Sequence, residues 1–295
     1  MALNGWIIID KPVGIGSTSV VSAVKRILRE AKEPKTKVGH AGTLDPLASG
    51  VLPIALGEAT KLCGRMLEAT KSYDFTISFG EETDTLDLEG EIVARSEVRP
   101  GVQEIEGVIG RFTGEIEQVP PAYSALKIGG KAAYARARAG EDVDLKPRRV
   151  TIEELSLLSL DEGKATLRAS VSKGTYIRSL ARDIARALGT VGHVSYLRRR
   201  RAGPFSLDSA ISLDFLEEAA KARALTRTVL PFESALDDIP ALPVTPDQAR
   251  LLRHGQMLFG FPAKPGLQLA TSEGIPVALV EASADGLRVV RGLNL

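Results

Sequence analysis

The chain has 295 residues, a formal net charge of +1, and 44% hydrophobic and 25% charged side chains. This composition is typical of soluble globular proteins, and the length predicts two domains. No stretch approaches the roughly 18 consecutive apolar residues of a membrane span. The apolar run at residues 6–9 is too short for a signal-peptide core, so we expect a cytoplasmic protein. A single cysteine, Cys63, excludes an internal disulfide, and three widely spaced histidines give no metal-ligand pattern, so we expect no metal.

Strand and helix patterns open the chain. Residues 6–10 predict a strand, and the segment after them predicts a helix with residues 17–19 as candidate N-caps. Residues 38–50 contain several glycines and a proline without periodicity, which indicates a shaped loop. The helical prediction rests on apolar side chains at spacings of three and four, namely Val20, Val24, Ile27, Leu28 and Ala31.

The middle of the chain mixes strands and helices. Residues 73–79 alternate strictly and predict a half-buried strand, after which the acidic residues 81–91 predict a loop and turn. A second alternating strand at 165–171 leads into a helix at 177–188, which Gly189 ends. There is no regular βαβ rhythm, so we expect an α+β fold with a mixed, largely antiparallel sheet flanked by helices.

Prolines mark a domain boundary near residues 232–245. Beyond it, three short strands are predicted at 267–271, 277–281 and 287–291, separated by turns that contain glycine. This pattern indicates a small C-terminal β-barrel. The expected division is therefore residues 1–235 and 236–295.

Positive charge is concentrated in the segment from Lys173 to Arg201. This segment carries a net charge of +7, although the whole protein is nearly neutral. Such a basic region can bind phosphates, although a run of charge is more often a solvated face. The charge pattern alone leaves both interpretations open.

Asp45 lies in the glycine-dense loop and precedes a proline. An Asp-Pro pair commonly forms a turn, because the short carboxylate bonds nearby backbone N–H groups and proline fixes the next φ. Glycines, however, let the backbone approach a ligand closely, and a lone carboxylate held there can act as a nucleophile or base.

Five co-linear segments of the chain carry recognisable motifs. They are Asp10-Lys11-Pro12-x-Gly14, Gly39-His40-x-Gly42-Thr43-Leu44-Asp45-Pro46 to Gly50, Lys71-x-Tyr73, Gln118-x-Pro120-Pro121-x-Tyr123-Ser124-Ala125-x-Lys127 and Gly174-Thr175-Tyr176-Ile177-Arg178-Ser179-Leu180. Together these segments resemble the bacterial tRNA pseudouridine synthase B family. The resemblance runs from residue 8 to about residue 205, and the remainder is similar to the small RNA-binding PUA domain that often follows in this family.

The resemblance implies three catalytic residues. Asp45 matches the essential aspartate, whose carboxylate drives cleavage of the bond between uracil N1 and ribose C1′ before the uracil turns and reattaches through C5. Tyr73 matches a tyrosine that stacks on the flipped base and is suited to removing the C5 proton, although it could also be a core aromatic. Arg178 matches an arginine that pairs with the aspartate, and a planar guanidinium can hold both carboxylate oxygens. We expect no cofactor, since there is no redox change or net hydrolysis.

Further residues are implied to bind RNA. Leu197 matches a leucine that packs on uracil, and His40 a histidine that fills the space left by the flipped nucleotide. Lys11 and Tyr176 resemble supporting residues of the substrate pocket, although Lys11 could equally be a surface lysine. Residues 120–149, called the arm below, resemble a flexible segment that closes over RNA. Contacts with the RNA backbone are expected from Lys127, Lys131, Arg148, Arg198 and Arg199.

The resemblance therefore implies a monomeric enzyme that converts uridine to pseudouridine in the T stem-loop of transfer RNA, at uridine 55, with residues 236–295 as a PUA-like RNA-binding domain. A non-catalytic RNA-binding or RNA-folding protein would explain the arginines but not Asp45, Tyr73 and Arg178 together. A glycoside hydrolase would use two carboxylates flanking the sugar bond, whereas only Asp45 has a recognisable motif.

Overall fold

The computed structural model describes residues 3–124, 126–141 and 145–295, and its largest unit is a nine-stranded sheet. The nine strands are β1 (Gly5–Lys11), β2 (Val38–His40), β3 (Ser49–Leu56), β4 (Lys71–Phe79), β7 (Gly114–Gln118), β10 (Arg148–Asp161), β11 (Lys164–Val171), β12 (Gly192–Ala202) and β13 (Phe205–Ser206). Seven of them follow the order β1-β3-β12-β4-β11-β10-β7, while β2 pairs with β3 and β13 with β12. The predicted α+β class with a mixed, largely antiparallel sheet is confirmed.

Strands β3 and β12 form the one parallel pairing in this sheet. Their register places Arg199 opposite Gly50, where the loop that carries Asp45 enters β3. Gly50 has φ +101°, and a Cβ added there would lie 2.1 Å from the Arg199 carbonyl oxygen. The close approach of the two strands therefore requires glycine at this position.

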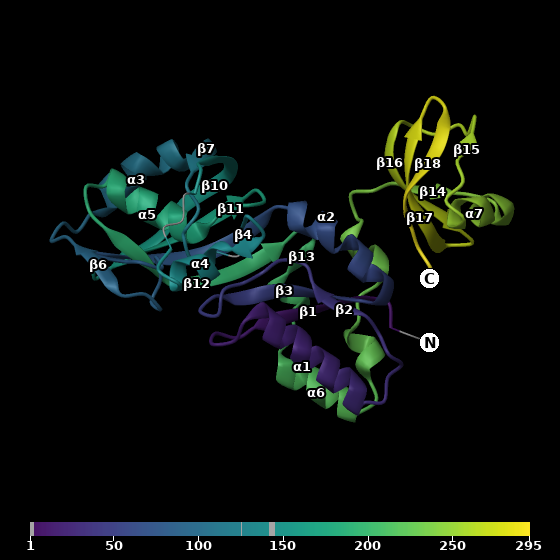
Figure 1. Ribbon diagram of the computed structural model, residues 1–295, viewed down its shortest axis with the longest axis horizontal. Coiled ribbons are helices and arrows are strands. Elements are labelled where there is room, and N and C mark those ends of the chain that lie inside the picture. Colours follow the sequence, from purple (N-terminus) through teal and green to yellow (C-terminus); the bar gives the residue numbers. More distant parts are fainter. Residues whose placement is uncertain (1–2, 125, 142–144) are drawn as a thin grey trace.

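Helices cover the sheet in two groups, which Figure 1 shows beside each other along the long axis. Helices α1 (Ser17–Glu30) and α6 (Leu213–Lys221) pack on β1 and β3, and helices α3 (Val102–Ile109) and α5 (Ile177–Ala187) pack on β4, β10 and β11. Strand β1 is buried on both faces. The predicted apolar positions of α1 are buried except Ala31, the helix's C-cap residue, and Gly189 follows α5 with φ +70°.

Short elements fill the connections. The acidic stretch 81–91, expected to be loop and turn, also supplies strand β5 (Glu81–Thr83), because backbone pairing with β6 (Ile92–Arg95) extends the turn into a hairpin. The other short elements are α2 (Cys63–Glu68) and the 3₁₀ turns η1 (Gly57–Leu62), η2 (Gly110–Phe112), η3 (Leu207–Ser209), η4 (Leu225–Thr228) and η5 (Phe232–Ala235).

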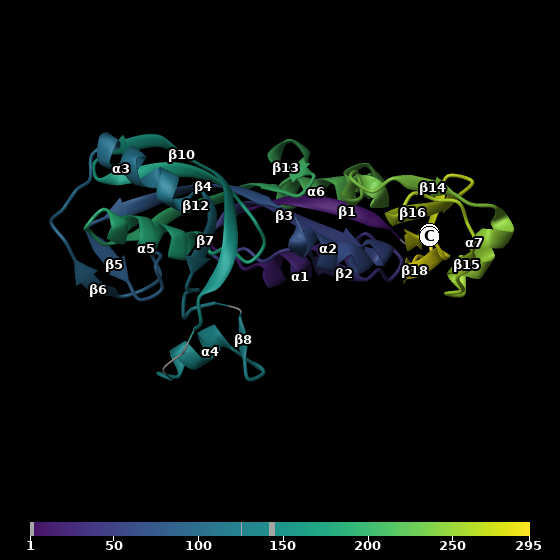
Figure 2. The same cartoon turned by 90° about the horizontal axis from the view of Figure 1, so that it is seen from above.

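The arm projects from the body between β7 and β10, as Figure 2 shows. Its described part contains strands β8 (Lys127–Ile128) and β9 (Lys131–Ala132), joined as a hairpin, and helix α4 (Ala133–Arg138). Ala125 of the arm motif and residues 142–144 lie outside the described residues.

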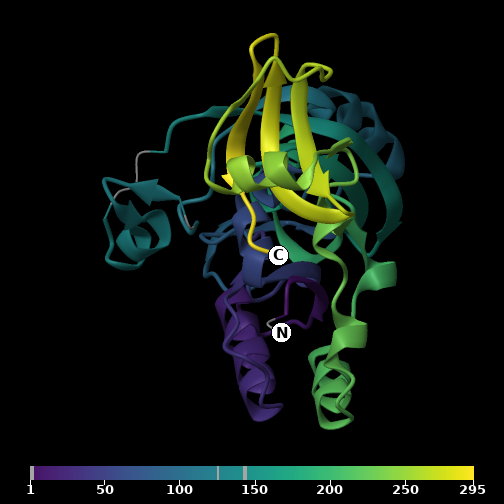
Figure 3. The same ribbon diagram turned by 90° about the vertical axis from the view of Figure 1, so that its right-hand side faces the viewer.

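The C-terminal part forms a second, curled sheet of five strands in the order β14-β16-β17-β18-β15, which faces the viewer in Figure 3. Its elements are β14 (Ala241–Pro243), α7 (Pro246–Arg253), β15 (Leu258–Phe259), β16 (Gly266–Ser272), β17 (Ile275–Ser283) and β18 (Gly286–Gly292). The three strands predicted here are confirmed, as part of a half-barrel.

A shared apolar core fixes the C-terminal sheet to the main sheet. Trp6 and Ile8, from one face of β1, belong to the same buried cluster as Leu269, Leu279 and Leu293. At its edge, Lys61 Nζ donates a hydrogen bond to the Gly292 carbonyl oxygen at 2.9 Å. The two sheets are therefore packed as one body. Within the described residues, no helix has the length and apolar character needed to cross a membrane.

We predict that Gly50→Ala lowers the free energy of unfolding by about 1–3 kcal/mol or more, because it forces a left-handed backbone on alanine and places a methyl group against β12. Urea denaturation measures this. Gly107→Ala is the control, since Gly107 lies in α3 with open space around it and should be neutral or slightly stabilised. Equal stabilities of the two variants would contradict the role given to Gly50.

Candidate active site

The loop between β2 and β3 holds Asp45 at the parallel junction of the sheet. Ser17 Oγ accepts a hydrogen bond from Leu44 N at 2.8 Å and donates one to the Leu44 carbonyl at 3.0 Å, while Gly14 N donates to the Pro46 carbonyl at 2.9 Å. The loop is thus fixed on both sides of Asp45, yet the Asp45 side chain remains 41% exposed. This leaves a carboxylate that is held in place and open to a ligand.

Lys11 supports the loop from below. Its side chain is fully buried, and Nζ donates hydrogen bonds to the carbonyls of Pro12, Ile15 and Pro46 at 2.9, 2.7 and 3.3 Å. Burial lowers the pKa of Lys11 to about 8, against the opposing effect of the Asp45 charge. The surface alternative for Lys11 is wrong, and so is a direct substrate contact, because all three of its protons face the protein.

Arg199 supports the other half of the loop. Its side chain donates hydrogen bonds to the carbonyls of Val51 at 2.7 Å, Thr43 at 3.2 Å and Gly42 at 3.1 Å. The residue is only 1% exposed. Our prediction that Arg199 contacts an RNA phosphate is wrong, because strand alternation in β12 turns this side chain inward.

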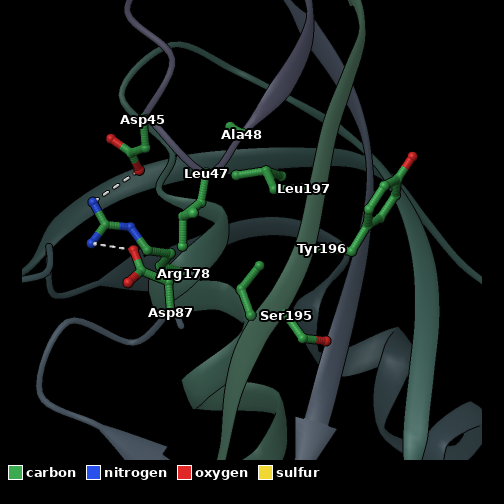
Figure 4. Close-up of a pocket in the computed structure, with 9 residues that line it drawn as sticks. Asp45, Leu47, Ala48, Asp87, Arg178, Ser195, Tyr196 and Leu197 are labelled. Atoms are coloured by element: carbon green, nitrogen blue, oxygen red, sulfur yellow. Dashed lines mark ion pairs between the residues drawn. The ribbon is translucent and has the colours of Figure 1, made fainter. Parts of the chain in front are cut away.

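Arg178 joins Asp45 to a second carboxylate. Its Nη2 lies 3.0 Å from Asp45 Oδ2, and its Nη1 lies 3.3 Å from Asp87 Oδ2 (Figure 4). The same two nitrogens donate hydrogen bonds to the carbonyls of Tyr123 at 2.9 Å and Thr85 at 2.7 Å. The pairing with Asp45 is present, but the expected grip on both of its oxygens is wrong, since the guanidinium is divided between two acids.

Asp87 was missed by the sequence analysis. It is buried, and its Oδ1 accepts hydrogen bonds from Thr85 Oγ1 at 2.6 Å and Glu89 N at 3.0 Å. Leu86, between Thr85 and Asp87, has φ +64°, an uncommon backbone conformation for leucine. The sequence offered little signal, because Asp87 is one of several acids in the stretch 81–91.

An apolar wall completes the pocket beside Asp45 and Arg178. Leu47 and Leu197 lie next to the ion pair in Figure 4, while the side chain of Tyr196 extends away from it. Tyr73 is not among the residues that line this pocket. It lies on β4 opposite Arg199 and, like Leu197, packs where the two helix-covered cores meet. The remaining lining residues are Ala48, Asp87, Val194 and Ser195.

His40 and Tyr176 are not among the residues that line the pocket. Burial, and then the Arg199 charge, lower the pKa of His40, which favours the neutral ring. Its Nδ1 has no hydrogen-bond partner among the described residues. Tyr176 precedes α5, and the Arg148 guanidinium carbon lies 4.9 Å from its ring centroid.

Most cations of the basic run between Lys173 and Arg201 have acidic or carbonyl partners within the chain, although Lys173, Arg186, Arg200 and Arg201 remain exposed. Apart from Arg178, described above, and Arg199, which donates to carbonyls, the ion pairs of this run are Lys173 with Glu68, Arg182 with Asp183, Arg186 with Glu82, Arg198 with Asp10 and Arg200 with Asp74. On the arm, Lys131 is exposed, and Lys127 is described only through its place in β8. The described residues contain no cluster of three or more metal-ligating side chains.

The N-terminal domain of the TruB family of pseudouridylate synthases matches residues 25–177, and the C-terminal domain of tRNA pseudouridylate synthase B matches residues 178–237. The chain belongs to the TruB family. Proteins named tRNA pseudouridine synthase B from Novosphingobium aromaticivorans and Zymomonas mobilis are each 59% identical over 99% of this chain, and over 98% and 97% of their own lengths.

Solved structures confirm the TruB fold. A chain from an H/ACA ribonucleoprotein bound to a substrate RNA containing 2′-deoxyuridine aligns with a TM-score of 0.74 and 26% identity, over 99% of this chain and 85% of its own. A chain from a Cbf5-Nop10-Gar1 complex aligns with a TM-score of 0.73 and 29% identity, over 97% of this chain and 83% of its own.

Because Arg199 supports the Asp45 loop, replacing it should lower the stability of this TruB protein without changing how it binds RNA. Arg199→Met leaves buried carbonyls unpaired, at about 1–3 kcal/mol each, so we expect lower stability with an unchanged salt dependence of tRNA affinity. Lys131→Ala is the comparison and should reduce the log–log salt slope by about 0.7–0.9 without lowering stability. A flatter salt slope for Arg199→Met would show that Arg199 contacts an RNA phosphate.

Proposed function

We propose that this chain isomerises uridine to pseudouridine in transfer RNA, with Asp45 as the essential carboxylate. The observation that carries the proposal is an accessible carboxylate, fixed on a glycine-rich loop and paired with Arg178 beside an apolar wall. Relatives named tRNA pseudouridine synthase B match almost the whole chain, which supports both the reaction and the substrate class.

The reaction rearranges one nucleotide and needs no external reactant. The bond between uracil N1 and ribose C1′ breaks, a bond from C5 to C1′ forms, C5 loses a proton and N1 gains one. In the proposal Asp45 drives the cleavage, and Arg178 holds its carboxylate in one orientation. The Tyr73 hydroxyl is proposed to take the C5 proton. Because Tyr73 does not line the pocket between Asp45 and Leu197, the base would extend toward β4 to meet it.

A uridine in a folded loop must leave its stack to reach Asp45, which costs a few kcal/mol. Leu197 is proposed to pack on the flipped uracil, while His40 fills the space that the base leaves in the RNA. A neutral His40 suits that role, since it adds no charge inside the RNA loop. We further propose uridine 55 of the T stem-loop as the target.

RNA would be held by the arm and by the C-terminal domain. We propose that the arm closes over the T stem-loop through Lys127, Lys131 and Arg148, and that residues 236–295 form a PUA-like RNA-binding domain. Arg198 remains a proposed backbone contact, although it already pairs with Asp10 at 2.7 Å. We also propose that the protein acts as a monomer in the cytoplasm.

Two other functions fit the site less well. A protein that only binds or refolds RNA has no need of an exposed carboxylate oriented by a buried arginine. A glycoside hydrolase needs two carboxylates that flank the sugar bond. Asp87 is the nearby candidate, but it is buried, and hydrogen bonds and the Arg178 contact occupy both of its oxygens.

The direct test incubates unmodified tRNA with the purified protein and no added cofactor, then maps pseudouridine by position. We predict that Asp45→Asn lowers the single-turnover rate by roughly 10²–10⁴-fold or more while tRNA affinity stays close to wild type, because the amide keeps the shape but cannot act as a carboxylate. Release of free uracil would indicate hydrolysis instead, and an Asp45→Asn variant with most of the wild-type rate would remove Asp45 from the mechanism.

Arg178→Lys tests whether geometry matters beyond charge. One ammonium nitrogen cannot reach all four acceptors that the guanidinium contacts, so we expect a rate loss of at least about tenfold, or 1.4 kcal/mol of barrier, with a modest change in affinity. Arg186→Lys is the matched control on the same helix, because its pair with Glu82 lies outside the pocket. Equal rates for both variants would show that charge alone suffices.

A further inference from the structure

Tyr123 connects the start of the arm to the arginine of the site. Its backbone carbonyl accepts the hydrogen bond from Arg178 Nη2 at 2.9 Å, and its side-chain hydroxyl donates one to Asp84 Oδ2 at 3.0 Å. A single residue thus contacts Arg178 through its main chain and the β5–β6 turn through its side chain. The hydroxyl contact has no part in the chemistry proposed above.

Asp84 is itself fixed in the β5–β6 turn. Its Oδ1 accepts a hydrogen bond from Glu91 N at 3.0 Å, and its backbone N donates to the Glu91 carbonyl at 3.0 Å. The next residue, Thr85, accepts the hydrogen bond from Arg178 Nη1 at 2.7 Å. The contacts therefore form a closed ring that runs from Arg178 through Thr85 and Asp84 to Tyr123 and back to Arg178.

The base of the arm is also tied to the start of α5, which carries Arg178. On the first side, the Val119 carbonyl accepts hydrogen bonds from Ser179 Oγ at 2.8 Å and Arg182 Nη2 at 3.2 Å. On the second side, Arg148 Nη2 donates to the Gly174 carbonyl at 2.6 Å. Both ends of the arm are therefore hydrogen-bonded to the first turns of α5 or to the residues just before it.

We infer that Tyr123 and Asp84 are positioning residues that couple the placement of the arm to the orientation of Arg178, and through it to Asp45. The inference rests on the proposed function. The Tyr123 hydroxyl fixes where its own carbonyl sits, and that carbonyl is one of the two acceptors on Arg178 Nη2, the nitrogen that also contacts Asp45. Loss of the hydroxyl contact therefore misplaces the carboxylate without removing a group that touches RNA.

Tyr123→Phe tests the inference directly, because it keeps the ring and removes only the hydroxyl. We expect the single-turnover rate at saturating tRNA to fall roughly fivefold to twentyfold, while tRNA affinity at fixed salt stays within about twofold, since a misplaced catalytic group affects the chemical step. A thermal melt close to wild type checks that the fold is intact. A rate within twofold of wild type would overturn the inference.

Asp84 supplies the matched pair of variants. Asp84→Asn can still accept from Glu91 N and present its amide to the Tyr123 hydroxyl, which can act as an acceptor, so it should keep nearly the wild-type rate. Asp84→Ala should be as slow as Tyr123→Phe, and the double variant Asp84→Ala with Tyr123→Phe should be no slower than Asp84→Ala alone. Multiplying effects in the double variant, or an Asp84→Asn variant as slow as Asp84→Ala, would overturn the coupling.

The same assay separates this inference from the proposed function. If the wild-type protein forms no pseudouridine in tRNA, the proposed function fails and the inference falls with it. If wild type forms product and Asp45→Asn does not, but Tyr123→Phe matches wild type, the function stands and the positioning role of Tyr123 alone is overturned.

Discussion

The Arg178 guanidinium is the interaction on which the site depends. It is 6% exposed, and a buried charge is costly unless its hydrogen bonds and its counter-charge are supplied. Here the acceptors come from three segments far apart in sequence: the loop of Asp45, the turn containing Thr85 and Asp87, and the base of the arm at Tyr123. Because each segment satisfies part of one cation, the three are positioned together, and the pocket exists only when all of them are in place.

Two cations hold the Asp45 loop, and among the described residues both donate hydrogen bonds to backbone carbonyls only. Lys11 reaches Pro46, and Arg199 reaches Gly42 and Thr43 in the loop; their other acceptors, Pro12, Ile15 and Val51, lie beside it. Hydrogen bonds from charged donors are among the stronger ones in proteins. Had acids filled these positions, additional carboxylates would lie near the site. With carbonyls as acceptors, the loop is rigid while Asp45 keeps its accessible face, as a preorganised catalytic group requires.

Local sequence patterns predicted the helices and strands, whereas the roles of individual site residues depend on contacts between segments far apart in sequence. The spacing of three and four in α1 and the alternation of residues 73–79 identified their structures correctly, because these patterns depend on burial of one face.

Arg199 was misassigned because residues 198–201 were read as a run of charge. In strand β12, Arg198 and Arg199 point to opposite faces of the sheet, and a register shift between Arg199 and Arg201 interrupts the alternation beyond them. Asp87 could not be singled out, since its pairing with a residue 91 positions away leaves no local trace. Helix α7 carried a usable signal that was missed, the capping box of Thr245 and Gln248 with Pro246 between them.

The pairing of the basic run changes where binding energy for RNA must arise. Cations that already meet Glu68, Glu82, Asp10 or Asp74 would have to exchange that partner for a phosphate, which reduces the net gain from each contact. The arm, by contrast, carries exposed cations such as Lys131 and Arg138 on a projection from the body. In the proposed enzyme this segment is also joined to Arg178 through Tyr123. Contacts with RNA far from the reacting bond can then be used to orient Asp45, which is how remote binding energy raises the rate of a chemical step rather than affinity alone.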